Sequence, residues 1–153
     1  MKKLIAMLIL SAGFVCTAQV PNYYKNNSSL SDNSGRPTYY YNRNGTTAGR
    51  SQTTGNTTYY YNGSGRSDGR STTNGNTTYY YNRNGTTAGR ATKVGNTTYY
   101  YDSVGRSAGK STTNGNTTYY YNRNGTTAGR STKSGNTTYY YDSTGRSAGK
   151  SIK

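Results

Sequence analysis

The chain has 153 residues, and its 19 Lys and Arg side chains against four acidic ones give a formal net charge of +15. It has no His, Glu or Trp, and its four Asp residues lie far apart, so it lacks the clustered groups that acid–base catalysis, nucleophilic triads and metal sites need. We therefore expect no enzyme activity, no metal site and no cofactor.

The N-terminus has the three regions of a secretory signal peptide. Lys2 and Lys3 precede the apolar run of residues 4–10, and small residues lead to Ala18, after which we expect cleavage. The run is shorter than the ~20 residues that cross a bilayer, so we expect no transmembrane segment in the mature chain. The product should be secreted, periplasmic or at a bacterial cell surface. A lipoprotein anchored through Cys16 is the alternative, although Val15 stands where a small residue is wanted.

Residues 19–37 should form a linker or a degenerate capping copy. Without the signal peptide the chain has no Cys, and hence no disulfide framework. Its only Leu, Ile, Val or Phe residues after Ala18 are Val20, Leu30, Val94, Val104 and Ile152. This excludes a conventional aliphatic core. Only the 20 Tyr residues argue for order, so a chain that orders on ligand binding or self-assembly is the alternative.

Six copies of a 20-residue repeat fill residues 38–153. Their Tyr triplets begin at Tyr39, Tyr59, Tyr79, Tyr99, Tyr119 and Tyr139. A fixed period without insertions indicates a stacked or arrayed architecture. We therefore predict an all-β fold, either a repetitive β-hairpin array or a β-solenoid of 20-residue repeats, preceded by a signal peptide.

Each copy is expected to contain two strands and two turns. Residues 57–61 are all β-branched or aromatic, which favours a strand. Residues 42–45 then place Asn first and Gly fourth, the pattern of a type I turn closed by a left-handed Gly45. A small, polar second strand over residues 46–51 leads to the second turn, where Gly55 should take the left-handed position.

Alternation along the first strand puts Tyr59 and Tyr61 on one face and Tyr60 on the other. The small residues of the second strand, such as Gly49 and Ser51, leave room for a ring to lie flat. Arg50 can stack on a ring through a cation–π contact.

The leading functional prediction is a surface binding protein for polyanionic or carbohydrate ligands. One row of aromatic side chains should stack on sugar rings: Tyr40, Tyr60, Tyr80, Tyr100, Tyr120 and Tyr140. One row of cations should meet acidic groups on the same polymer: Arg50, Arg70, Arg90, Lys110, Arg130 and Lys150. The expected partners are acidic or neutral polysaccharide, lipopolysaccharide or cell wall, bound through many weak sites. The alternative is a structural protein that self-associates edge to edge into an amyloid-like fibre or matrix.

Two repeat families share features with these copies. Residues 99–106 and 139–146 resemble the Tyr-x-Tyr-Asp-x-x-Gly-Arg signature of YD repeats in Rhs-type surface proteins. That resemblance implies β-sheet repeats and a link to carbohydrate binding. The 20-residue period, with Gly75, residues 79–81, Gly85 and Gly89 in order, is also similar to choline-binding and glucan-binding cell-wall repeats. Arg50 and its equivalents replace the tryptophan of that family, so the resemblance implies stacking on glycan.

Overall fold

The computed structural model describes residues 35–153, so the predicted signal peptide, Cys16 and most of the linker lie outside the described residues. The described residues form twelve strands and no helix. The strands are β1 (Thr38–Asn42), β2 (Thr47–Thr54), β3 (Thr57–Asn62), β4 (Ser67–Asn74), β5 (Thr77–Tyr81), β6 (Thr87–Val94), β7 (Thr97–Asp102), β8 (Ser107–Asn114), β9 (Thr117–Tyr121), β10 (Thr127–Ser134), β11 (Thr137–Asp142) and β12 (Ser147–Ile152). No helix long and apolar enough to span a bilayer occurs in the described part of the chain.

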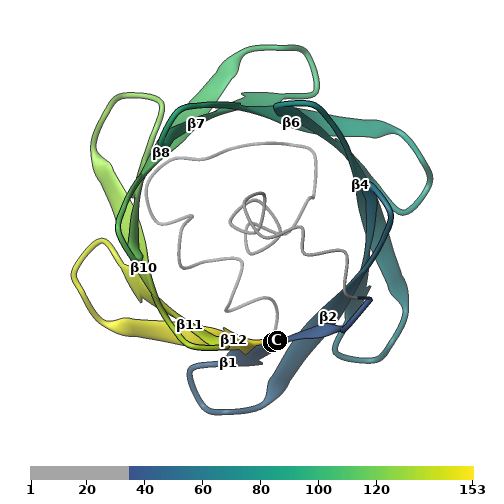
Figure 1. The fold of residues 1–153 in the computed structure, drawn as a ribbon, viewed down its shortest axis with the longest axis horizontal. Helices are drawn as coiled ribbons and strands as arrows, with labels where there is room; N and C mark the ends of the chain where they lie inside the picture. The colour runs from purple at the N-terminus through teal and green to yellow at the C-terminus, as the bar shows by residue number, and fades with distance from the viewer. Residues whose placement is uncertain (1–34) are drawn as a thin grey trace.

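The twelve strands form one closed antiparallel barrel. Each strand pairs with its sequence neighbours, and the ring closes where β1 pairs with β12, with Tyr40 opposite Ser151. Figure 1 shows the ring in a view along the barrel axis, with hairpins spreading outward around its rim. The all-β hairpin array is confirmed. The β-solenoid alternative is wrong, because consecutive hairpins lie edge to edge in one closed sheet instead of coiling in stacked layers.

Two kinds of turn mark the two ends of the barrel. At the end that we call the wide rim, the Gly45 amide donates to the Asn42 carbonyl at 2.9 Å, and Gly45 has a φ of 80°. At the opposite end, which we call the narrow rim, Gly55 has a φ of 59°. The predicted left-handed glycines of both turns are confirmed, since an L side chain rarely adopts such a backbone.

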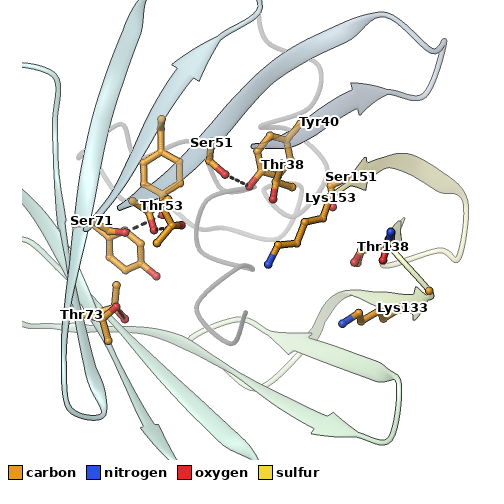
Figure 2. Close-up of a pocket in the computed structure, with 16 residues that line it drawn as sticks. Thr38, Tyr40, Ser51, Thr53, Ser71, Thr73, Lys133, Thr138, Ser151 and Lys153 are labelled. Atoms are coloured by element: carbon orange, nitrogen blue, oxygen red, sulfur yellow. Dashed lines mark hydrogen bonds between the residues drawn. The ribbon is translucent and has the colours of Figure 1, made fainter. Parts of the chain in front are cut away.

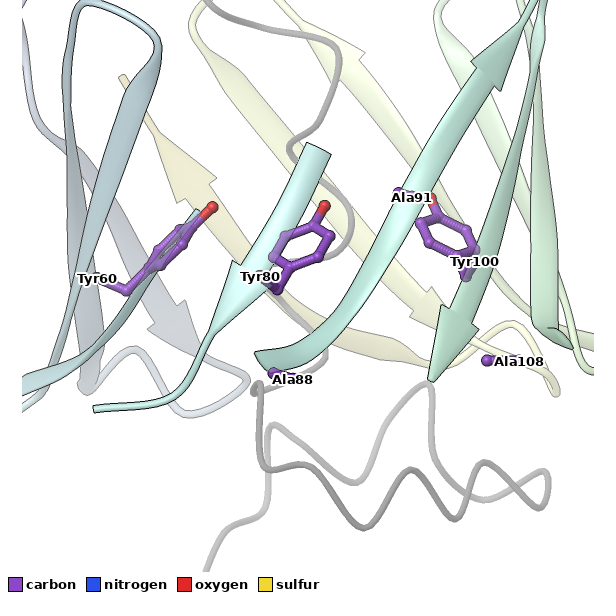
Figure 3. Close-up of a cluster of buried hydrophobic side chains, with 6 residues drawn as sticks. All are labelled: Tyr60, Tyr80, Ala88, Ala91, Tyr100 and Ala108. Atoms are coloured by element: carbon purple, nitrogen blue, oxygen red, sulfur yellow. The ribbon is translucent and has the colours of Figure 1, made fainter. Parts of the chain in front are cut away.

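The Tyr triplets alternate across the barrel wall as predicted. Tyr60 is 4% exposed and faces the lumen, whereas Tyr59 is 43% exposed on the outside. Ring packing over small side chains takes the place of an aliphatic core: Tyr60 lies opposite Gly69, and Tyr80 opposite Gly89. Figure 3 shows Tyr60, Tyr80 and Tyr100 in successive hairpins with their hydroxyl groups towards the same end. The buried core therefore forms a ring on the inner surface of the wall.

A β-bulge recurs in every copy near the wide rim. In the pairing of β5 with β6, Tyr80 lies opposite Gly89 but Tyr81 lies opposite Thr87, so Ala88 is the extra residue. Gly89 has a φ of 147°, and the matching glycines of four other copies have φ values from 126° to 150°. A bulge bends its strand and increases the local twist, which closing a sheet requires.

Candidate functional site

The outer surface carries a belt of aromatic rings and cations, which we call the outer belt. Its exposed rings, each 40–43% accessible, are Tyr39, Tyr59, Tyr79, Tyr99, Tyr119 and Tyr139. Its cations are Arg50, Arg70, Arg90, Lys110, Arg130 and Lys150. The register repeats around the barrel: Arg50 lies opposite Tyr39 on one side and opposite Tyr61 on the other.

Each cation of the outer belt lies over the ring of a half-buried Tyr. The Arg50 guanidinium is 4.2 Å from the centre of the Tyr61 ring, and the six such distances range up to 5.8 Å. The predicted cation–π contact is therefore present in every copy. Because the ring carries no formal charge, it holds the cation in place without neutralising it.

The few acidic residues of the described chain serve its turns. The Asp142 carboxylate accepts bonds from the amides of Thr144 and Arg146 and from the Thr144 hydroxyl, at 2.7 to 2.9 Å. The Thr144 hydroxyl bond is the main cause that lowers the pKa of this carboxyl. No group of three or more His, Cys, Asp and Glu side chains gathers within residues 35–153. The outer belt therefore faces solvent as a surface of positive charge.

The inward Tyr ring is closed to ligands approaching from outside. Each of these rings is 9% exposed or less. The Tyr60 hydroxyl lies 2.8 Å from the Ser71 hydroxyl, two residues beyond Gly69 towards the narrow rim. The same pairing joins Tyr40 to Ser51, Tyr100 to Ser111, Tyr120 to Ser131 and Tyr140 to Ser151.

The two predicted ligand-binding rows do not share a surface. The cation row lies outside, as a polymer-binding row should, but the rows of Tyr40, Tyr60, Tyr80, Tyr100, Tyr120 and Tyr140 line the lumen. That these rings and the cations meet the same polymer must be corrected, because side chains of opposite parity stand on opposite sides of the wall. The exposed rings beside the cations belong to the Tyr39 row, which the sequence prediction missed. Its signal was available: a charged residue stays outside, and Tyr39 is its cross-strand neighbour.

Burial of the inward phenols makes the barrel sensitive to alkali. Loss of water around the ring raises the pKa of Tyr60 and of Tyr140 to about 12, partly offset by the serine bonds, and it raises the pKa of Tyr120 well above its ordinary value. In the unfolded chain these phenols titrate near pH ~10. A raised pKa gives a stabilisation that is complete below that pH and is lost as the pH rises through the folded value.

We therefore expect the free energy of unfolding to fall between pH ~10 and ~12. Denaturant unfolding at a series of pH values, followed by circular dichroism, measures this. Tyr60→Phe removes one titrating group, so its stability should decline less steeply over the same range. An identical decline in the variant and the parent would contradict the assignment.

Comparison with known proteins gives no match: no family model fits the chain, and no curated protein matches it. The resemblances to YD repeats and to choline-binding and glucan-binding repeats therefore stay predictions.

Proposed function

We propose that this is an exported binding protein whose outer belt holds polyanionic or acidic carbohydrate polymers. The observation that supports it is the register of the belt, in which an exposed Tyr ring and a cation alternate as cross-strand neighbours in all six copies. Sugar rings stack on aromatic faces, and carboxylate, sulfate or phosphate groups pair with Arg and Lys. One copy thus offers both contacts to one acidic sugar unit.

Preorganisation favours this use of the belt. A free Arg side chain loses rotamer freedom when it binds, at a cost of about 0.5–1.5 kcal/mol. Arg50 is already held over Tyr61, so part of that cost is met in the folded protein. Weak single sites that are fixed at regular spacing then add through multivalency along a repetitive ligand.

Closure of the barrel determines how a polymer can engage the belt. Copies on opposite sides of the ring face opposite directions, so one stiff polymer chain contacts only the copies on its own side. The remaining copies stay open to a second chain. The protein should therefore bridge polymer chains, which suits a role in an extracellular matrix or on a cell wall.

Two six-residue variants with equal charge test the proposal. The belt variant replaces Arg50, Arg70, Arg90, Lys110, Arg130 and Lys150 with Gln. The rim variant replaces the wide-rim turn residues Arg43, Arg66, Arg83, Arg106, Arg123 and Arg146 with Gln. We expect the belt variant to bind dextran sulfate at least about tenfold more weakly than the rim variant, with a shallower salt dependence, by about one unit of slope per lost contact.

Neutral dextran and alginate complete the design. Alginate should bind the parent protein and become turbid through bridging, while neutral dextran should bind weakly through stacking alone. Replacing the exposed Tyr39 row with Ser should weaken binding to both. If the belt and rim variants lose affinity equally, net charge alone accounts for binding and the proposal is wrong.

Self-association through open strand edges is not favoured by this fold. Every strand in the described residues is paired on both of its edges, including β1 with β12. Closure removes the free edge on which amyloid-like growth depends. Fibre formation thus stays a prediction that would first require the barrel to open.

A further inference from the structure

The lumen has the same chemistry in all six copies except mainly at one level near the narrow rim. There, three copies carry Thr53, Thr73 and Thr113, each with its hydroxyl 3.0 Å from a Thr hydroxyl of the next strand. The other three copies carry Lys93, Lys133 and Lys153 at this level. In the register, Lys133 lies opposite Thr138 as Thr53 lies opposite Thr58.

Lysine at this level is not required by the fold. Three of the six copies close the same hairpin with Thr and gain a hydroxyl–hydroxyl bond. Lysine gives up that bond and brings a cation to the mouth of the lumen, on a protein that already has a large excess of positive charge. Such a substitution raises self-repulsion unless an anion binds beside it.

A cavity of about 290 Å³ opens at this mouth. Twelve strands make a wider barrel than the eight-stranded kind that side chains just fill, so space remains below the Tyr ring. Figure 2 shows Lys133 and Lys153 extending towards the cavity from neighbouring hairpins, with Ser and Thr side chains around it. Its hydroxyl lining comprises Thr38, Tyr40, Ser51, Thr53, Thr58, Tyr60, Ser71, Thr73, Thr78, Tyr80, Thr138 and Ser151. No acidic side chain belongs to the lining.

We propose that this cavity binds a small phosphorylated or sulfated sugar. Lys133 and Lys153 would hold the anionic group at the mouth, and the Ser, Thr and Tyr hydroxyls would bond the sugar hydroxyls deeper in the lumen. Hydroxyl groups both donate and accept, which matches a sugar and matches an apolar ligand poorly. The volume is at the small end for ligand pockets, ~300–1,000 Å³, and fits a single sugar unit.

This site is separate from the outer belt, because the wall of the barrel lies between them. A polymer can reach the belt but is too large for the cavity, so a small ligand reports on the lumen alone. The proposal therefore stands or falls independently of polymer binding by Arg50 and its equivalents.

Calorimetric titration of the purified protein tests the site with glucose 6-phosphate, N-acetylglucosamine 6-sulfate, glucose and inorganic phosphate. We expect one of the two charged sugars to bind with one site per barrel and at least tenfold more tightly than glucose or phosphate. The double variant Lys133→Thr/Lys153→Thr should lose at least tenfold of that affinity. It should remain folded, since Thr occupies the same position in three natural copies.

A matched control is Arg83→Thr/Arg123→Thr, which removes the same charge from exposed wide-rim turns and should leave the affinity unchanged. Dextran sulfate binding by the Lys133→Thr/Lys153→Thr protein should also persist, which shows that the outer belt is intact. Equal affinity for inorganic phosphate and the charged sugars, an unchanged affinity in the lysine variant, or no binding of either charged sugar would overturn the proposal.

Discussion

Replacing Tyr60 with alanine should lower the free energy of unfolding by about 3–5 kcal/mol, the usual loss when a buried aromatic side chain is truncated. The Tyr60 ring is 4% exposed, and it belongs to a cluster with Tyr80, Tyr100 and the small residues between them. Few aliphatic side chains are present to fill the space that the ring would leave. Urea unfolding followed by circular dichroism measures the loss.

Two further variants separate the contributions of the ring. Tyr60→Phe keeps the ring but removes the hydroxyl bond to Ser71, so we expect a loss of about 1 kcal/mol. Tyr59→Ala removes a neighbouring ring that is 43% exposed and should cost about 1 kcal/mol or less. If Tyr60→Ala cost no more than Tyr59→Ala, the inward rings would not form a core.

The local structure of each hairpin follows directly from the sequence. Strand formation, the left-handed Gly45 and Gly55, the alternation of the Tyr triplet and the stacking of Arg50 depend on residues that are close together in the chain. Such features are set by side-chain parity and turn chemistry, which one repeat already contains. The six copies therefore supported the same prediction six times.

Closure of the barrel depends on information that a repeat does not contain. A 20-residue period is equally compatible with an open sheet, a solenoid or a ring, and the β1–β12 pair joins residues more than a hundred positions apart. The signal that was missed is the glycine inside the second strand, Gly49 and its equivalents. An invariant glycine away from a turn indicates a bulge, and regular bulges indicate curvature.

The choice of binding face was also beyond the prediction, for a related reason. Both faces of the sheet carry Tyr rings, so alternation alone does not say which row is buried. Gly49 and Ser51 face the Tyr40 side of the wall, where rings can pack closely, and that burial turns the Tyr39 row outward with the cations. Only the curvature of the closed sheet decides between the two rows.

Gly89→Ala should therefore be among the most damaging single substitutions in the barrel, with an expected loss of about 3 kcal/mol or more. A φ of 147° is a backbone conformation that costs a non-glycine residue about 1–3 kcal/mol. In addition, an added Cβ would overlap the Tyr101 carbonyl oxygen on β7. That oxygen belongs to the sheet backbone, so relief of the overlap would require the strands to move apart.

Gly85→Ala is the matched control, four residues away in the same hairpin. Gly85 also has a positive φ, of 83°, but an added Cβ there meets nothing within 4 Å. Its loss should be only the conformational part, about 1–2 kcal/mol. Gly129→Ala repeats the test in another copy, where the overlap is with the Tyr141 carbonyl oxygen. Equal losses at Gly85 and Gly89 would mean that the bulge relaxes freely, and the curvature of the sheet would then need a cause other than these glycines.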